Sequence, residues 1–559
     1  MQSIRLFILL VTGYFSHMSL IACERSTTEA NNEENQRFNI LIAVSDDQSY
    51  PHAGIYGEKT VNTPAFDRLA SEGVLFHNAF AAAPGCAPSR SSIHTGRYQW
   101  QNEEAGGHQT LFPLRYVTYP DVLEEAGYYI GYTGKGVSPF NLEASGRERN
   151  PAGPAWNDIA YEGEEREQLP SNMFAWYYNY AANFEAFLES RPADQPFYFW
   201  FGAREAHRPY EQGTGLRNGK RLEDVTVPGF YPDSEEIRSD LLDYAFEIEW
   251  FDRHLMKMIT KLEELGELDN TLVIITSDQG MPFPRAKSNL YDYGLRVPLA
   301  VYWPGRVMGG REVYDLISLA DIAPTLLELT GASTESMMPV TAKSFADILF
   351  TDQSGIIDPE RDAVYAGRER HSSARWANLG YPQRSVRTHD YLYIRNFSPE
   401  RWPAGAPQML HPDNPSELYY KHGLDENGRF TGNAYFDIDS SPTKTYLIEN
   451  MHDPAVAFYY ELSMGKRPAE ELYDVANDPY NIHNLAEEPG YAETLASMRK
   501  KLHDFLRETE DPRVVGPVPD VFENHQRFAG LRGFPRPDWM KEEYLKSDHH
   551  VESFLLNKD

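Results

Sequence analysis

Three short, almost continuous runs of apolar residues constrain the fold of this chain most. They lie at residues 38–44 (FNILIAV), 196–201 (PFYFWF) and 272–276 (LVIIT). Runs this short and apolar are typical of strands that are buried on both faces of a parallel sheet. Helical patterns separate them, notably at residues 63–70 and 235–265, where each pattern ends at a glycine. The sequence therefore predicts an α/β fold, with a large, mostly parallel sheet sandwiched by helices.

The pattern changes beyond about residue 375. Residues 384–397 and 471–474 read as short strands, and residues 492–508 read as an amphipathic helix. We expect a smaller C-terminal α+β subdomain at 376–520, after a large domain at 38–375. A Pro-rich, polar tail follows at 521–559.

Polar residues follow each of the three apolar runs. Asp46 and Asp47 come after the first run, His207 after the second, and Asp278 and Gln279 after the third. Ligands of parallel α/β sheets bind beyond the carboxyl ends of strands, so these side chains are candidates for one site. Taken alone, the Asp46-Asp47 pair also fits a helix cap or a solvated turn.

Charge and cysteine content exclude some classes of protein. The 559 residues contain 52 Lys and Arg against 83 Asp and Glu, a formal net charge of −31, with no basic block. Nucleic-acid binding is therefore not expected. Exposed charges are screened beyond about 8–10 Å, so an anionic substrate remains compatible with this acidity. The only two cysteines, Cys23 and Cys86, provide no disulfide framework.

The first cysteine ends a targeting segment. Arg5 precedes an apolar stretch at 6–20, and residues 20–23 (LIAC) resemble a bacterial lipobox. This resemblance implies a signal peptide at 1–22, lipidation of Cys23, and a polar tether at 23–37. The mature protein would be lipid-anchored in the cell envelope, at the outer membrane, in the periplasm or on the cell surface. An ordinary secretory signal with an incidental cysteine is the alternative.

The second cysteine begins the sequence CAPSR at 86–90, and TGR follows at 95–97. This pattern resembles the signature of the type I sulfatases, C-x-P-S-R-x(4)-T-G-R, and the likeness extends from about residue 39 to 485. It implies an alkaline phosphatase/sulfatase-like fold with 38–375 as the catalytic domain. It also implies that a maturation enzyme oxidises Cys86 to formylglycine (3-oxoalanine). The plainer interpretation is a buried, unmodified cysteine.

Sulfate ester hydrolysis requires a nucleophile to approach an anion, which a divalent cation assists. The resemblance implies one Ca²⁺, rather than Mg²⁺, with ligands from Asp46, Asp47, Asp278, Gln279 and residue 86. The carboxylate and amide oxygens suit a hard cation. Gln279 departs from the family pattern, which usually has Asn and sometimes His at this place.

Four further residues match catalytic positions of the family. Arg90 would orient the formylglycine and the metal cluster, Lys135 and Lys287 would bind the sulfate, and His207 would protonate the leaving group. A second departure is Val137, because many sulfatases have a histidine there. We expect His94, His108 or water to replace it.

Several stretches resemble the sulfamidase branch of the family, including GHQ at 107–109 and TSDQGMPFP at 276–284. Bacterial members of this branch also act on algal polysaccharides such as ulvan. The predicted substrate is a sulfated carbohydrate, of either ulvan or heparan type. The candidate substrate-binding residues are His108, His371 and Arg384.

Three other functions stay open from the sequence. A formylglycine-dependent phosphonate or phosphodiester hydrolase would share Cys86 and the metal site. A non-catalytic, glycan-binding lipoprotein would account for Val137 and Gln279. A structural surface protein would have no use for the Cys86 motif.

Overall fold

The three predicted strands are confirmed in the computed structural model, which describes residues 37–170, 177–411, 413–419, 434–517 and 521–540. They form the centre of an eight-stranded sheet with the order β3-β4-β1-β5-β6-β2-β7, in which β8 also pairs with β2. The strands are β1 (Asn39–Ser45), β2 (Val74–Phe80), β3 (Tyr129–Gly134), β4 (Phe197–Gly202), β5 (Thr271–Ser277), β6 (Arg296–Tyr302), β7 (Arg311–Val313) and β8 (Ile317–Ser318).

The sheet is mixed, with β6 as the strand that breaks the parallel pattern. β4 pairs in parallel with β1 and with β3, and β2 pairs in parallel with β7 and β8. β6 is antiparallel to both β5 and β2. The predicted mostly parallel α/β sheet is therefore confirmed, with one reversed strand.

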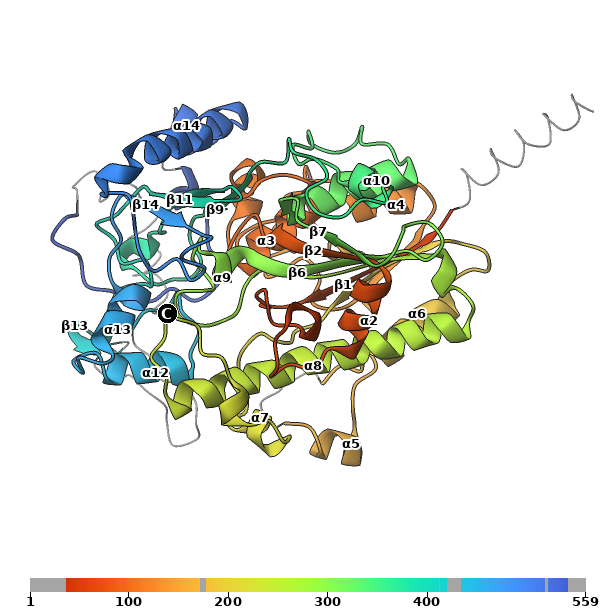
Figure 1. The fold of residues 1–559 in the computed structure, drawn as a ribbon, viewed down its shortest axis with the longest axis horizontal. Coiled ribbons are helices and arrows are strands. Elements are labelled where there is room, and N and C mark those ends of the chain that lie inside the picture. Colours follow the sequence, from red (N-terminus) through yellow and green to blue (C-terminus); the bar gives the residue numbers. More distant parts are fainter. Residues whose placement is uncertain (1–36, 171–176, 412, 420–433, 518–520, 541–559) are drawn as a thin grey trace, which may run out of the picture. The chain divides into compact units, whose positions relative to one another are not determined.

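Helices cover both faces of this sheet (Figure 1). One face carries α2 (Pro64–Glu72), α6 (Tyr180–Ser190) and α8 (Glu235–Glu264), and the other carries α3 (Cys86–Thr95), α4 (Tyr119–Glu125) and α10 (Ile322–Thr330). The shorter helices are α5 (Gly163–Glu167), α7 (Thr214–Arg217), α9 (Asp292–Leu295), α11 (Ala346–Leu349), α12 (Pro442–Glu449), α13 (Ala457–Met464) and α15 (Pro512–Val515).

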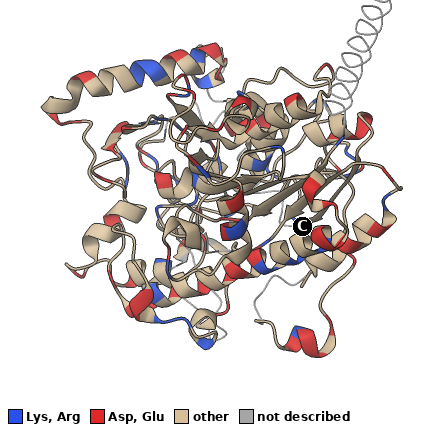
Figure 2. Cartoon of the chain, turned by 45° about the vertical axis from the view of Figure 1, so that its right-hand side comes forward, with Lys and Arg blue, Asp and Glu red and all other residues tan. Residues whose placement is uncertain are grey.

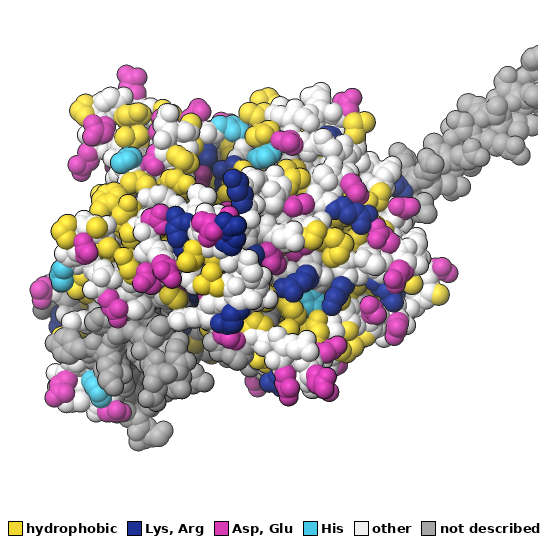
Figure 3. Space-filling view, turned by 60° about the horizontal axis from the view of Figure 1, so that its bottom comes forward, with side chains coloured by type: hydrophobic (Ala, Val, Ile, Leu, Met, Phe, Trp, Pro, Cys, Tyr) yellow, Lys and Arg dark blue, Asp and Glu magenta, His cyan; other side chains and the backbone are white. Residues whose placement is uncertain are grey.

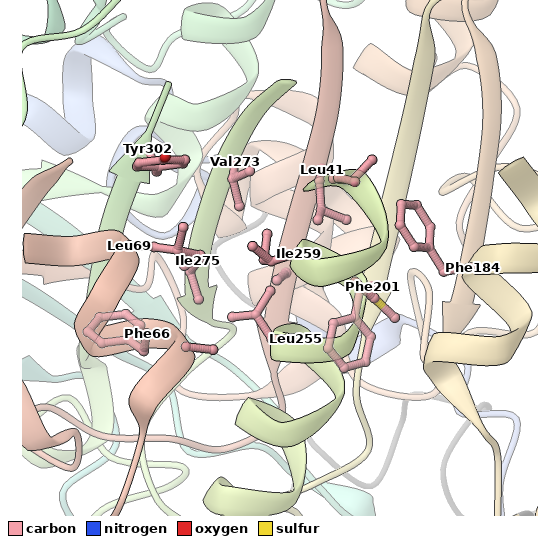
Figure 4. Packing of buried hydrophobic residues seen from close by; sticks show 14 of the residues in the cluster. Leu41, Phe66, Leu69, Phe184, Phe201, Leu255, Ile259, Val273, Ile275 and Tyr302 are labelled. Carbon is pink, nitrogen blue, oxygen red and sulfur yellow. The ribbon is translucent and has the colours of Figure 1, made fainter. Parts of the chain in front are cut away.

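The largest core lies between the sheet and α8. Leu255 and Ile259 on α8 are fully buried against β-strand residues such as Leu41 and Ile275 (Figure 4). α2 is attached to α8 by Asp252, whose carboxylate accepts the backbone N–H groups of Ala65 and Phe66 at 2.9 and 2.8 Å. These are the first free N–H groups of α2, so Asp252 both caps that helix and fixes it beside α8.

A second, four-stranded sheet has the order β14-β11-β10-β9, and α14 (Ala492–Glu508) packs against it (Figure 1). Its strands are β9 (Val364–Arg368), β10 (Gln383–Arg387), β11 (Tyr391–Asn396) and β14 (Glu470–Asp474). Because β9 belongs to it, this sheet begins before the boundary expected at residue 376. A hairpin of β12 (Met409–His411) and β13 (Asn414–Tyr419) follows. The described residues from Ile40 onward belong to one compact unit, in which the second sheet packs beside the first.

The segment at 521–540 is not the tail that its composition indicates. The Phe528 N–H donates to the Gln109 carbonyl at 2.8 Å, and Gly533 accepts from the Leu410 N–H at 2.8 Å. The segment therefore joins the large domain to the β12–β13 hairpin. The predicted signal peptide, Cys23, most of the tether and residues 541–559 lie outside the described residues. Among the residues that are described, no helix combines the length and the apolar character that a membrane crossing requires.

Acidic residues are spread over the outer helices (Figure 2). Figure 3 shows Lys and Arg side chains across the middle of one face, with acidic side chains mainly around its edge. On the face that Figure 3 shows, basic side chains therefore gather locally despite the net negative charge of the protein.

Replacing Leu255 by alanine tests the α8 packing. We expect Leu255→Ala to lower the free energy of unfolding by about 2–5 kcal/mol, because it leaves a cavity in the main core. Leu265→Ala, at the exposed end of the same helix, is the matched control and should have little effect. Equal losses in urea unfolding of the two variants would contradict this account of the core.

Candidate active site

The carboxyl ends of β1 and β5 place four polar side chains together. Asp46 and Asp47 follow β1, and Asp278 and Gln279 follow β5, its neighbour in the sheet. The two loops are joined by the Asp278 N–H, which donates to the Ser45 carbonyl at 3.2 Å, and by the Asp47 N–H, which donates to Asp278 Oδ1 at 3.1 Å. All four side chains are buried. The predicted convergence at the strand ends is what the structure shows.

Cys86 is the first residue of α3 and is also buried, at 1% exposure. Its Sγ lies 4.0 Å from Asp47 Oδ1, and Gln279 Nε2 lies 3.3 Å from the same sulfur. Ser89, one turn further along α3, donates from Oγ to the Asp278 carbonyl at 2.5 Å. The first turn of α3 is thus attached to the loop after β5, which holds residue 86 against the carboxylates.

Three cations pair with these carboxylates. Arg90 Nε lies 2.7 Å from Asp278 Oδ2, Lys135 Nζ lies 2.5 Å from Asp46 Oδ2, and Lys287 Nζ lies 2.6 Å from Asp47 Oδ2. All three side chains are at least nine-tenths buried, so solvent screens these pairs little. The cations surround the space in front of Cys86 and can bind an anion there.

The charges around Cys86 shift its pKa and those of its neighbours. Burial alone would raise the pKa of Cys86, but Lys135, Lys287 and a hydrogen bond with His207 lower it to about 6. Burial would also raise the pKa of Asp46, yet Lys135 and Arg90 hold it well below its usual value. For Asp47 burial prevails over Lys287 and raises the pKa to about 7. The site therefore stabilises negative charge at residue 86 and at Asp46.

His207 faces the same space. Its Nδ1 lies 2.6 Å from the Arg208 carbonyl, so the proton on Nδ1 is donated there and Nε2 points to Asp47, 3.8 Å from Oδ2. The Arg208 guanidinium is itself fixed by two 2.8 Å contacts with Asp240. Burial and Lys287 lower the pKa of His207, but Asp47, Cys86 and Asp46 together raise it to about 9. His207 is thus protonated at neutral pH and can donate a proton.

The oxygen donors fit a hard divalent cation. Asp46, Asp47 and Cys86 offer ligand atoms within 4.8 Å of one another. Gln279 Oε1 is buried and has no hydrogen-bond partner among the residues that the structure describes. Asp46 Oδ1 accepts no hydrogen bond there either, although Arg90 Nη2 lies 3.5 Å away as an ion-pair partner. Buried oxygens without hydrogen bonds are costly, and a cation coordinated by carboxylate and amide oxygens removes that cost.

Sequence reasoning missed Asp439, which lies 3.0 Å from Lys287 Nζ and groups with Asp47 and His207. It belongs to an irregular segment more than 150 residues beyond Lys287, and no motif marks it. Val137 is fully buried and provides no base. His94, one of the candidates to replace it, is wrong for that role. Its ring packs on Tyr119 and Trp200 in the core, and burial lowers its pKa to about 3.

The three predicted substrate-binding residues separate into two groups. The rings of His108 and His371 lie 4.7 Å apart, and His371 Nδ1 is 3.1 Å from the position that a Cβ on Gly85 would take. Both histidines therefore lie beside the turn that carries Cys86. Arg384 does not. It is completely buried on β10, with Asp511 at 2.6 Å and Glu369 at 2.8 Å, so we correct its role to a structural one.

The fold and the site together define an enzyme that handles an anionic group at a buried, activated side chain. The family model described as Sulfatase matches residues 38–332, over half of the sequence, so the chain belongs to the sulfatase family. A second model, described as the C-terminal part of N-sulphoglucosamine sulphohydrolase, matches residues 285–403. The chain is thus a sulfuric ester hydrolase, and its resemblance to sulfamidase is confirmed.

Two curated relatives are similar over most of their length. An ulvan-active sulfatase of Formosa agariphila is 28% identical over 494 residues, covering 87% of this chain and 83% of the relative. Human N-sulphoglucosamine sulphohydrolase is 28% identical over 506 residues, and the match covers 86% of this chain and 92% of the relative.

Two solved structures show the same fold. One is the structure of a protein in complex with its substrate, D-glucosamine-2-N,6-O-disulfate. It has a TM-score of 0.57 and 18% sequence identity, and the match covers 87% of this chain and 99% of that chain. The other is a complex with k-i-k-neocarrahexaose, with a TM-score of 0.54 and 18% identity, covering 87% and 97%.

Removing Arg90 tests the buried charge pairs. We expect Arg90→Met to lower the free energy of unfolding by about 3–5 kcal/mol, because it leaves buried carboxylates without their cation. Arg68→Met is the matched control, since Arg68 pairs with Glu72 and Glu263 on the surface, where such pairs contribute about 0–1 kcal/mol. Urea unfolding curves that show the same loss for both variants would contradict the importance of Arg90.

Proposed function

We propose that this enzyme removes sulfate groups from a sulfated polysaccharide or its oligosaccharides, of ulvan or heparan type, using formylglycine at position 86. The observation that carries the proposal is the position of Cys86 Sγ, enclosed by the predicted metal ligands and facing two buried lysines and His207. The names of the two relatives support a sulfated carbohydrate substrate. A formylglycine-generating enzyme is the maturation partner that this modification requires.

The residues around position 86 divide the chemical tasks. Lys135 and Lys287 bind the sulfate oxygens, and their burial strengthens this attraction. His207, whose pKa of about 9 keeps it protonated at neutral pH, gives its Nε2 proton to the departing sugar oxygen or nitrogen. Arg90 holds Asp278 in place. Formylglycine, once hydrated, supplies the nucleophilic hydroxyl that the unmodified cysteine lacks.

We propose Ca²⁺ as the cation, held by Asp46, Asp47, Asp278 and Gln279. Ca²⁺ accepts irregular sets of oxygen ligands, whereas Mg²⁺ demands near-ideal octahedral geometry, so the longer glutamine side chain suits Ca²⁺ better. When bound, the ion offsets the negative charge of the carboxylates and of the sulfate.

We also propose that the enzyme is anchored in the cell envelope through a lipid on Cys23. The support for this location is the LIAC sequence at 20–23 and the polar stretch that follows it. The tether would place the catalytic domain within reach of polysaccharide fragments outside the cytoplasm.

Measuring free sulfate from defined ulvan and heparan oligosaccharides tests the activity. Matured wild-type enzyme should release sulfate from at least one of them, and Cys86→Ala should reduce release by at least about a thousandfold, because the nucleophile is lost. Cys23→Ala is the matched control, expected to retain activity while moving from the membrane to the soluble fraction. Full activity of Cys86→Ala would overturn the proposed function.

Thermal unfolding tests the metal site without measuring activity. Ca²⁺ at about 100 times its Kd should stabilise the protein by about 2.7 kcal/mol, and so raise its Tm over that measured in EDTA. Gln279→Leu removes one ligand oxygen and should shrink this shift, whereas Gln168→Leu, an exposed glutamine, should leave it unchanged. The same calcium-dependent shift in both variants would show that Gln279 is not a ligand.

A further inference from the structure

A cavity of about 250 Å³ lies outside the sulfatase site, where the loop before β10 meets the segments around residues 402 and 537. Its volume is just below the range of about 300–1,000 Å³ that is usual for ligand pockets, and it has room for a monosaccharide unit. Its most distinctive walls are three tryptophans and three arginines: Trp376, Trp402, Trp539, Arg375, Arg401 and Arg536. We call it the tryptophan pocket.

Two of the three arginines form ion pairs and hydrogen bonds with other residues of the chain. Arg375 contacts Asp437 at 2.6 Å and also donates to the carbonyl groups of Trp402 and Pro403. Arg401 Nη1 lies 2.6 Å from Glu523 and donates to the Gly380 carbonyl. These two side chains therefore form part of the wall of the tryptophan pocket and fix the loops that carry Trp376 and Trp402.

Arg536 differs from the other two. Its side chain is exposed, and it makes no hydrogen bond or ion pair with any other residue in the described part of the chain. A second exposed cation, Lys466, lies with its Nζ 5.2 Å from the centroid of the Trp402 ring. The Arg536 guanidinium is therefore available to pair with an anionic group of a ligand in the tryptophan pocket.

The turn that presents Trp376 is strained. Ala377 and Asn378 have φ angles of 52° and 55°, in the left-handed region that non-glycine residues seldom occupy. The Asn378 Oδ1 is buried and has no hydrogen-bond partner among the described residues. Strain of this kind persists where the surroundings enforce it and is concentrated at binding sites. The half-buried Trp376 is thus held at the pocket rather than packed into the core.

The tryptophan pocket is close to the site at residue 86. Trp376 is five residues from His371, so the two Cα atoms are at most about 18 Å apart. His371 in turn lies beside Gly85, which precedes Cys86. The separation along the chain is therefore short enough to allow one oligosaccharide to have one unit at the sulfatase site and another unit in the tryptophan pocket.

We propose that the tryptophan pocket is a second sugar-binding site, which takes an acidic sugar unit of the polysaccharide at a distance from the sulfate being removed. The inference deepens the proposed function and rests on it for the nature of the polymer. The apolar face of the sugar ring packs on the indole rings, and Arg536 pairs with a sulfate or carboxylate group of the same unit. Occupation of both sites favours long chains over single sugars, because the second contact is made at high effective concentration.

Calorimetric titration of the full chain, carrying Cys86→Ala to prevent turnover, tests the pocket independently of catalysis. The probes are sulfated hexasaccharides from ulvan and heparan, their desulfated forms, and neutral maltohexaose. Adding Arg536→Ala or Trp539→Ala should weaken binding of the preferred sulfated hexasaccharide about tenfold. Arg306→Ala, which removes an exposed arginine elsewhere, should leave the affinity unchanged.

Each outcome of this titration is informative. If Arg536→Ala also weakens binding of the desulfated hexasaccharide, Arg536 pairs with a carboxylate. If the substitution weakens binding of the sulfated form alone, Arg536 pairs with a sulfate. Both results support the proposal. Unchanged affinity in the Arg536→Ala and Trp539→Ala proteins, no binding of either sulfated hexasaccharide, or equally tight binding of maltohexaose would overturn it. Arg536 is exposed, so its variant stays informative even where Trp539→Ala fails to fold.

Steady-state kinetics of the enzyme that retains Cys86 distinguish binding in the tryptophan pocket from the chemical step at residue 86. Arg536→Ala should raise KM for the hexasaccharide about tenfold, with kcat unchanged and with unaltered hydrolysis of a small aryl sulfate that cannot reach the pocket. An equal loss of activity of Arg536→Ala on the aryl sulfate would show that Arg536 does not act only on distant sugar units. If the parent enzyme releases no sulfate at all, the proposed function fails, yet the titration still decides whether the pocket binds acidic sugars.

Discussion

The arrangement of alternating charges at the ends of β1 and β5 determines most of what this enzyme can do. Asp46, Asp47 and Asp278 are buried there together, and each has its own cation. Without these cations the carboxylates would repel one another in a medium of low dielectric constant. The loops, α3 and the β3 end that carry the paired groups are therefore tied together, and Cys86 takes its position from that network.

The sequence predicted the elements that depend on local patterns. The runs at 38–44 and 272–276 gave β1 and β5 because strands buried on both faces must be apolar throughout. The helix expected at 492–508 coincides with α14, since its apolar face repeats at helical spacing. The convergence of Asp46, Asp47 and Asp278 followed from the carboxyl-end rule for parallel strands, whereas the place of Cys86 beside them was implied only by the resemblance to the sulfatases.

The features that the sequence did not predict depend on contacts between distant residues. Arg384 has an ordinary strand neighbourhood, and only the fold brings Asp511 and Glu369 to it. Asp439 lies in an irregular segment, so no periodicity could connect it with Lys287. Residues 521–540 have the composition of a tail, but backbone hydrogen bonds to Gln109 and Leu410 order them. Such bonds are independent of side-chain type and leave no trace in the composition.

The return of residues 521–540 to the large domain has a consequence for biosynthesis. Arg527 donates to the carbonyl groups of both His108 and His371, two loops that lie 419 and 156 positions earlier in the chain. During synthesis the central sheet can form long before these residues leave the ribosome. Arg527 can contact these two loops only after all the residues of the site at position 86 have been synthesised. A chain that stopped before residue 527 would therefore contain those residues but lack this contact.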